Sequence, residues 1–185
     1  MKRETTKQKL INATLELSEI YDNIDRITSR DISKKSGINL ALINYHFDTK
    51  ENLLRLVAEI KLNSIIKSTI EEFDESLSAY DKIKKLLLDT ASFAFENINS
   101  FKVISRYEMN VGCIHSLELF RPYFQEHLPD TEEGLLTIIL LRLLVFYHTI
   151  ILSPEDYGKV LGVDFFDDLQ RNEFLTDMLN MAIHL

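Results

Sequence analysis

The segment "LALINYHF", residues 40–47, places a tyrosine and a histidine beside an asparagine and small apolar residues. Hydroxyl and imidazole groups can donate hydrogen bonds to phosphate oxygens, and an asparagine amide can make a paired contact with adenine. Alanine and leucine suit the methyl group of thymine. These contacts require Asn44, Tyr45 and His46 to lie on the outer side of a helix, so the neighbouring sequence must supply that helix and hold it in place.

Local signals predict a helix that ends at Gly37. Thr28 can begin this helix as its N-cap, and Asp31, three residues on, can complete a box-like cap. Lys34 and Lys35 come near its end, where cations suit the helix dipole. Gly37 then stops the helix in a left-handed conformation that other residues disfavour.

A second short helix is predicted over residues 40–46, with Asn39 as its cap. We expect Ile32, Ile38 and Ile43 to face inward and to fix the angle between the two helices. The outer side of the second helix would then carry Ala41, Leu42, Asn44, Tyr45 and His46. Two helices joined in this way form a helix-turn-helix, whose second helix fits the major groove of DNA. The pattern alone is equally typical of a helical hairpin inside a bundle.

The rest of the chain has apolar residues at helical spacing, and its five Gly and three Pro are too few for a β-sandwich or barrel. We therefore predict an all-α fold of about nine to ten helices, a three-helix N-terminal unit followed by a larger helical body. Residues 22–27 are expected to form a polar joint, Ile60 and Leu169 to face the core, and Pro122 to break a helix. The other predicted helices cover residues 5–21, 49–75, 80–98, 100–112, 114–127, 132–152, a short stretch within 153–162, and 165–184.

The charge of the 185-residue chain is unevenly distributed. Its net charge is −8, but residues 1–50 hold nine Lys and Arg against seven Asp and Glu, so the acidic excess lies entirely in residues 51–185. A small DNA-facing unit on an acidic body has this asymmetry. The first ten residues are polar and lack the apolar core of a signal peptide, which predicts a cytoplasmic protein.

The sequence lacks the residue sets that are typical of an enzyme. Cys113 is the only cysteine, so neither an intrachain disulfide nor a cysteine zinc cluster can form. His115 and Glu118 lie three residues apart, but a metal site requires more ligands. There is no Gly-rich phosphate loop and no Gly-flanked serine. We therefore predict no enzymatic activity, no metal and no cofactor.

Residues 135–152 are apolar enough for a membrane span to be considered. Arg142 lies near the centre of this segment, and a central arginine costs about 2.5–3.5 kcal/mol on insertion. A helix that is apolar nearly all round must be covered on every side. We therefore predict a helix buried between other helices or against a second copy of the chain.

The segment "TSRDISKKSGINLALINYHFDTKENLL", residues 28–54, resembles the DNA-binding signature of the TetR family of bacterial transcriptional regulators. The matching residues are Thr28, Ile32, Gly37, Ile38, Ile43, Tyr45, His46, Phe47, Lys50, Glu51 and Leu53. Two residues depart from the family pattern: Asn44 stands where many members have Tyr, and Ser33 where a small apolar Ala is usual. The resemblance covers roughly residues 5–55; the remaining residues match only in being helical.

The resemblance implies two domains: a helix-turn-helix DNA-binding domain, residues 1–48, and a helical ligand-binding and dimerisation domain, residues 49–185. Lys2 and Arg3 would add an N-terminal arm. Leu40, one turn before Ile43, fits either the core or the DNA-facing side. The residues implied to contact phosphates or bases are Thr28, Arg30, Asn39, Leu40, Ala41, Leu42, Asn44, Tyr45, His46 and Lys50.

The family also implies a homodimer through helices near 132–152 and 165–184, which binds double-stranded operator DNA, usually as a repressor. A small-molecule ligand would bind within the body and reduce operator affinity. Candidate ligand-binding residues are Phe93, Tyr107, Phe120, Phe124, Phe146 and His148, and a wider set adds Phe101, Tyr147, Arg106, Glu108, Asn110 and His115. The alternative is a DNA-binding helical interaction protein that is controlled by a protein partner and has no small-molecule inducer.

Overall fold

The structure is a computed structural model that describes residues 5–21, 23–74 and 76–184. Over these residues it contains ten α-helices, one short 3-10 helix (η1) and no strand, which confirms the predicted all-α class. In chain order the elements are α1 (Thr6–Ser18), η1 (Ile24–Arg26), α2 (Ser29–Ser36), α3 (Ala41–Phe47), α4 (Lys50–Glu71), α5 (Ala79–Glu96), α6 (Ile98–Asn110), α7 (Ile114–His127), α8 (Glu133–Leu152), α9 (Pro154–Leu161) and α10 (Asp168–Ile183). Lys2 and Arg3, predicted to form an arm, lie outside the described residues.

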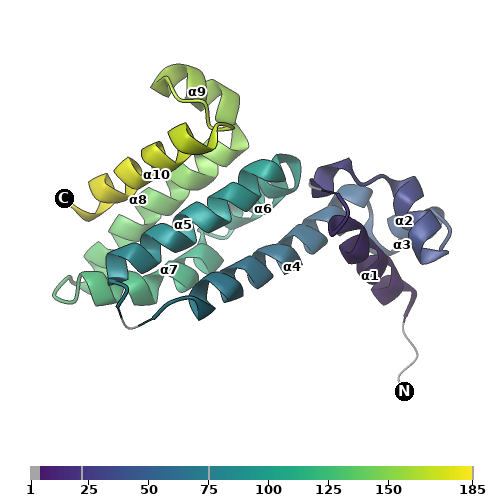
Figure 1. Ribbon diagram of the computed structural model, residues 1–185, viewed down its shortest axis with the longest axis horizontal. Coiled ribbons are helices and arrows are strands. Elements are labelled where there is room, and N and C mark those ends of the chain that lie inside the picture. Colours follow the sequence, from purple (N-terminus) through teal and green to yellow (C-terminus); the bar gives the residue numbers. More distant parts are fainter. Residues whose placement is uncertain (1–4, 22, 75, 185) are drawn as a thin grey trace.

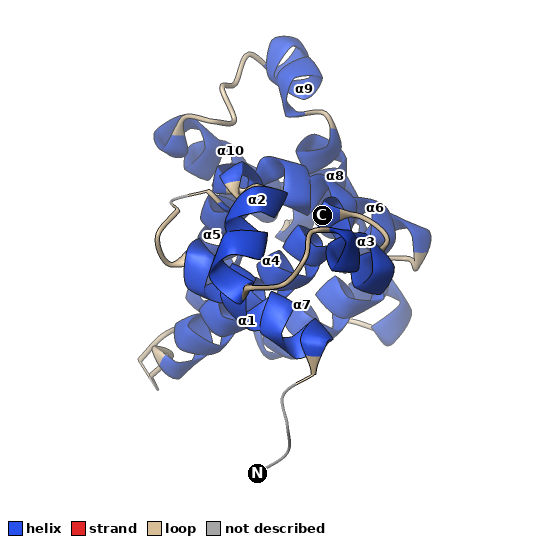
Figure 2. Cartoon of the chain, turned by 90° about the vertical axis from the view of Figure 1, so that its right-hand side faces the viewer, coloured by secondary structure: helices blue, strands red, loops and turns tan. Residues whose placement is uncertain are grey.

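The helices form a small group at one end of the molecule and a larger group at the other (Figure 1). We call α1, η1, α2 and α3 the head, and α5 to α10 the body. Helix α4 runs from the head along the body, contacting α1 and α3 at one end and α5 and α6 further on. Viewed from the head end, α1, α2 and α3 lie in front of the body (Figure 2). Helix α4 therefore connects the head to the body and packs against both.

Isoleucine side chains from several elements make the core of the head. Ile24, Ile27, Ile32 and Ile43 are all at most 2% exposed. The prediction of a polar joint at residues 22–27 was wrong in this respect, because η1 turns two of these isoleucines inward. Residues 23–27 are therefore a packed part of the head.

The end of α4 and its buried side both differ from the prediction. The helix ends at Glu71 rather than near residue 75, and Ile60 is 38% exposed. Leu54 and Ala58 are buried instead. The buried side turns along the helix because the head covers α4 at its start and α5 and α6 cover it further on.

Helix α7 continues through Pro122, which was predicted to break it. Pro122 is exposed, and so is Glu118, whose carbonyl loses its hydrogen-bond donor there and faces water. On the opposite side Leu117, Phe120 and Phe124 are buried and hold the helix in place. Burial of this side outweighs the loss of one exposed backbone hydrogen bond.

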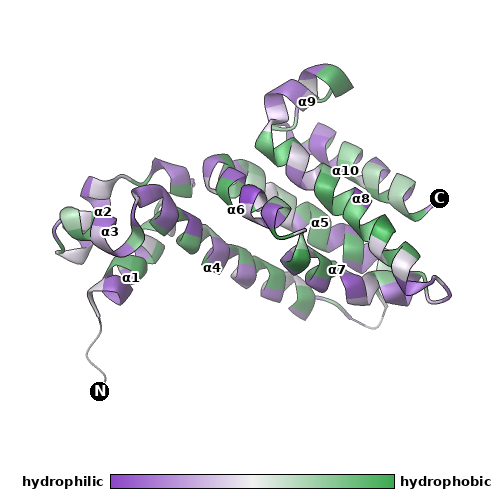
Figure 3. Ribbon diagram, turned by 180° about the vertical axis from the view of Figure 1, so that it is seen from behind, coloured by the Kyte–Doolittle hydropathy of each residue, from purple (hydrophilic) through white to green (hydrophobic). Residues whose placement is uncertain are grey.

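Helix α8 is apolar nearly all round, as the hydropathy colouring shows (Figure 3). Among the described residues it is the one helix long and apolar enough to cross a membrane, and half of its most apolar 18-residue window is buried within the protein. Leu169 on α10, predicted to face the core, is 69% exposed, because α10 begins only at Asp168 and Leu169 lies in its first turn. The exposed apolar side chains of α8 and α10 are Leu135, Ile138, Val145, Leu169 and Met181.

Candidate DNA-binding surface and ligand cavity

The two ends of α2 are fixed by local hydrogen bonds. Thr28 Oγ1 accepts from the Asp31 N–H at 3.2 Å, and Asp31 Oδ2 accepts from the Thr28 N–H at 2.9 Å, so the predicted capping box is confirmed. The Thr28 hydroxyl, which donates to Asp31 Oδ2 at 2.5 Å, and the Thr28 N–H hold the pKa of Asp31 below its ordinary value. Gly37 ends the helix with a φ of +69°, as predicted. Ser33 Oγ donates to the Ile38 carbonyl at 2.7 Å, so the departure from alanine at residue 33 closes the turn.

Helix α3 is held on the head by two apolar side chains. Ile43 is fully buried and Phe47 is 7% exposed, as expected for its inner side. The corner that leads to α4 is fixed by Asn52, whose Nδ2 donates to the Phe47 carbonyl at 2.9 Å. Asn39 Oδ1 accepts from the Ala41 N–H at 2.9 Å at the start of the helix. These contacts set the direction in which α3 presents its outer side.

The outer side of α3 is open to solvent. Tyr45 is 79% exposed, and Leu40 and Leu42 are 40% and 37% exposed, which places Leu40 on the surface. None of the ten residues assigned to DNA contact is buried: Thr28, Arg30, Asn39, Leu40, Ala41, Leu42, Asn44 and Tyr45 are exposed, and His46 and Lys50 are half-buried. Phosphates and base edges therefore have access to all of them.

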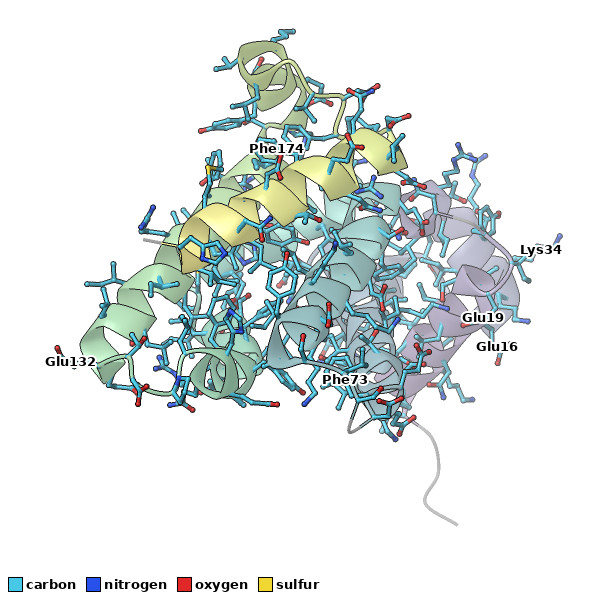
Figure 4. All side chains as sticks on the ribbon, turned by 60° about the vertical axis from the view of Figure 1, so that its left-hand side comes forward. Glu16, Glu19, Lys34, Phe73, Glu132 and Phe174 are labelled. Carbon is cyan, nitrogen blue, oxygen red and sulfur yellow. The ribbon has the colours of Figure 1, made fainter. Side chains whose placement is uncertain are left out.

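Cations flank this surface. Arg30 and Lys34 make no ion pair within 4 Å of any described residue, and the Lys34 side chain extends outward from α2 (Figure 4). Lys35 is paired with Glu16 at 2.7 Å. Lys50 Nζ lies 3.4 Å from the Ile27 carbonyl at the base of α3. Arg30 and Lys34 are therefore available for phosphate oxygens.

A cavity of about 780 Å³ lies between α4, α5, α6, α7 and α8. This volume is in the range of sites that take drug-sized ligands, about 300–1,000 Å³. Its apolar and aromatic lining consists of Leu62, Ile66, Phe101, Val103, Ile104, Tyr107, Leu119, Phe120, Leu144 and Tyr147. Its polar lining consists of Arg55, Glu59, Asn63, Thr90, Glu108, His115, Ser116 and His148.

The structure brings half of the six candidate ligand residues to this cavity. Tyr107, Phe120 and His148 line it, and so do four members of the wider set, Phe101, Tyr147, Glu108 and His115. Phe93, Phe124 and Phe146 do not line it, because Phe93 packs edge-on against Phe101, Phe124 is fully buried in the core, and Phe146 contacts Tyr157 and Phe174. Arg106 and Asn110 are also absent from the lining. Arg55 and Glu59 of α4 were missed, although their i, i+4 spacing marks a pair on one side of the helix.

Hydrogen bonds join three side chains of the cavity lining, Glu108, Ser116 and His148, to the buried Ser105. Ser116 Oγ donates to Glu108 Oε2 at 2.9 Å, so its oxygen is left to accept from His148 Nε2 at 3.1 Å. His148 Nδ1 then accepts from Ser105 Oγ at 3.1 Å. Burial lowers the pKa of His148 to about 4, so the ring is neutral at neutral pH. The directions of these bonds assign its proton to Nε2.

Glu108 stays ionised although it is only 5% exposed. Burial alone would raise the pKa of Glu108, but hydrogen bonds from the Ser116 N–H at 3.0 Å, from His115 Nδ1 at 2.6 Å and from the Ser116 hydroxyl outweigh it, so that pKa lies below its ordinary value. Nearby, the Tyr147 hydroxyl is buried and makes no hydrogen bond of ordinary geometry with a described residue. Burial raises the pKa of Tyr147, so it remains a neutral donor and acceptor.

A second connection between head and body runs through η1. Asp25 accepts hydrogen bonds from the Asn99 N–H at 2.8 Å, from the Ser100 N–H at 3.0 Å and from Ser100 Oγ at 2.5 Å, and so caps the N-terminus of α6. The buried Asn97 accepts from the Ile24 N–H at 2.7 Å and donates to the Phe93 carbonyl at 2.9 Å. Helix α6 also lines the cavity, so the cavity wall is attached to the head at two places, α4 and α6.

Comparisons with known proteins agree with this arrangement. The chain is 30% identical over 155 residues to the biofilm operon HTH-type negative transcriptional regulator IcaR of Staphylococcus epidermidis, a match that covers 76% of this chain and 82% of that protein. It is 21% identical over 108 residues to the nucleoid occlusion factor SlmA of Vibrio cholerae, covering 58% of this chain and about half, 55%, of that protein. No family model matches the sequence. On the extent of the first match, together with the ten-helix fold and the helix-turn-helix of α2 and α3, the chain belongs to the TetR family of helix-turn-helix transcriptional regulators.

Proposed function

We propose that this chain is a cytoplasmic repressor that binds double-stranded operator DNA by inserting α3 into the major groove. The observation that carries this proposal is the outer side of α3, which is open to solvent while Ile43 and Phe47 anchor the helix from behind. The name of IcaR, a negative transcriptional regulator, supports repression. Leu40, Ala41, Leu42 and Asn44 would then meet base edges, and Thr28, Arg30, Tyr45, His46 and Lys50 would meet phosphates.

The repressor would bind DNA as a homodimer through α8 and α10. Exposed apolar side chains on these helices, among them Ile138 at 54% and Met181 at 61%, support this pairing because a second copy would remove them from water. A twofold-symmetric pair would present two α3 helices to successive major grooves, about 34–36 Å apart.

A small molecule in the cavity would control operator affinity. The cavity favours this mode over control by a protein partner, because it offers a volume of about 780 Å³ with converging polar groups. Its walls include α4 and α6, both of which contact the head, so a ligand that moves either helix changes the orientation of α3. Residues 1–48 would then work as the DNA-binding domain and residues 49–185 as the ligand-binding and dimerisation domain.

Binding to duplex fragments from upstream of the chain's own gene tests this proposal. Affinity should fall steeply as salt rises, because phosphate contacts release counterions. Tyr45→Ala and Lys50→Ala should weaken binding to all fragments, whereas Asn44→Ala should change the preferred sequence. Lys67→Ala is the matched control, because Lys67 is an exposed lysine of α4 away from the head. Absent or salt-independent binding, or equal losses in the control variant, would contradict the proposed function.

A further inference from the structure

The charged groups that line the cavity are unbalanced. Arg55 is the single Lys or Arg among the lining residues, and it is already paired with Glu59, four residues on along α4. This leaves the carboxylate of Glu108, on α6, without a permanently charged partner. The one basic group that touches Glu108 is the imidazole of His115, whose side chain is 61% exposed. An imidazole this exposed can turn into solvent, where water replaces its hydrogen bond to Glu108 and only its stacking on the Tyr107 ring is lost.

The neighbours of Glu108 cannot remove its charge. Two of its three hydrogen bonds come from Ser116, a residue of α7, and both favour the ionised carboxylate. His148 stays neutral in the cavity and is joined to Glu108 only through the Ser116 hydroxyl. The carboxylate therefore imposes a negative potential on the cavity, and because its own side chain is only 5% exposed, its interaction with a charge is stronger than in open water.

The rest of the lining suits the apolar part of a ligand. Phe101, Tyr107, Phe120 and Tyr147 supply aromatic rings from α6, α7 and α8. The faces of such rings attract cations, because the ring quadrupole places negative charge there.

From these observations we infer that the cavity takes a monovalent organic cation with aromatic or apolar groups, and that Glu108 is its counter-charge. The inference rests on the proposed function, since it names the chemical class of the controlling ligand. A cation would replace the contact of His115 with Glu108 and lie against the aromatic rings. An organic anion of the same size would meet two carboxylates and no unpaired Lys or Arg in the lining.

Tetraphenylphosphonium and tetraphenylborate test this inference, because the two ions have nearly the same shape and opposite charge. Binding to the full-length protein is measured by calorimetry and by thermal shift, since a ligand that binds the native state raises the melting temperature. We expect the phosphonium ion to bind and the borate ion not to bind. Glu108→Gln should weaken phosphonium binding about tenfold or more. Glu118→Gln removes the same charge from an exposed position on α7, outside the cavity lining, and should leave the affinity unchanged.

The control is needed because the whole chain carries a charge of −8, which attracts any cation weakly. Borate binding as tight as phosphonium binding, binding of neither ion, or equal effects of E108Q and E118Q would overturn the inference. If E108Q fails to fold, the comparison of the two ions on the wild-type protein still decides. Operator affinity measured with and without bound phosphonium separates the two proposals: an unchanged affinity contradicts ligand control and leaves the cation site intact.

Discussion

The cap that Asp25 places on α6 gives a direct way to loosen the head from the body. The carboxylate of this η1 residue accepts from two backbone N–H groups and one hydroxyl at the start of α6, some 75 residues further along the chain. Asp25→Ala removes all three hydrogen bonds and leaves both backbone donors without a protein partner. The replacement creates no steric clash, because it only shortens the side chain.

The expected loss of stability follows from the geometry. Loss of an N-cap side chain costs about 0.5–2 kcal/mol, and loss of its interaction with the helix dipole adds about 0.3–1 kcal/mol. Because Asp25 is half-buried, water replaces only part of these contacts. The free energy of unfolding should therefore fall by about 1–3 kcal/mol, and the melting temperature by about 2–4 °C for each kcal/mol in a chain of this length.

Asp25→Ala should change the coupling between ligand binding and operator binding more than it changes the affinity for the ligand or for the operator. Operator affinity is measured with and without the cavity ligand, and ligand affinity separately, so that the coupling free energy is obtained. We expect a smaller ligand effect on operator affinity, because movement of α6 is no longer passed to η1. Asp74→Ala is the matched control: Asp74 accepts from the Ser76 N–H at 2.7 Å in the loop between α4 and α5, away from the head.

The coupling route through α6 would be refuted by one result in particular. If Asp25→Ala lowers stability as expected but leaves the ligand effect on operator affinity equal to that of wild type and of Asp74→Ala, the cap is purely structural. Coupling would then run through α4 alone.

Three further outcomes are expected. His148 has a pKa of about 4 in the folded chain and 6.5 in the unfolded chain, so between these pH values the unfolded chain binds more protons. The free energy of unfolding should therefore keep its full value above pH 6.5 and fall by about 3 kcal/mol towards pH 4. Denaturant titrations should show that this part of the pH dependence is lost in His148→Gln and kept in a variant of the exposed His184. Gly37→Ala should lower the free energy of unfolding, measured in urea, by about 1 kcal/mol, because a φ of +69° is strained for alanine. Nothing lies within 4 Å of the added methyl group, so no steric clash contributes, and an unchanged free energy of unfolding would contradict the strain argument. Ile138→Glu should convert the proposed dimer to monomer in sedimentation equilibrium, whereas Val160→Glu, on a residue of α9 that is 82% exposed, should not; a dimeric Ile138 variant would exclude this part of α8 from the proposed interface.

The parts of the structure that sequence could predict depend on short-range physics. Thr28 and Asp31 are three residues apart, and the Gly37 N–H bonds to the carbonyl of Ser33 four residues before it, so the cap and the turn are both visible in the sequence itself. The inward position of Ile43 follows from the same local spacing. These elements were predicted correctly because no distant part of the chain has to be known.

The features that escaped prediction depend on distant contacts. Asp25 and Asn97 lie more than seventy residues apart in sequence, and nothing near either one indicates that η1 and α6 meet. Phe120 and Phe124 occupy the same side of α7, yet only Phe120 lines the cavity. Helical spacing identifies an inner side, but the empty volume is set by how five helices pack together. Pro122 stayed helical for the same reason, since burial of the opposite side decided the outcome.

The position of Asp25 has a consequence for chimeric regulators. A hybrid regulator that combines the DNA-binding domain of one protein with the ligand-binding domain of another would normally be joined near the start of α4, after residue 48. Here the body helix α6 receives its first-turn acceptor from a residue on the other side of that cut. A fusion partner without an acidic residue at the equivalent place would leave the beginning of α6 frayed, so a working hybrid has to transplant the η1 turn together with the body it caps.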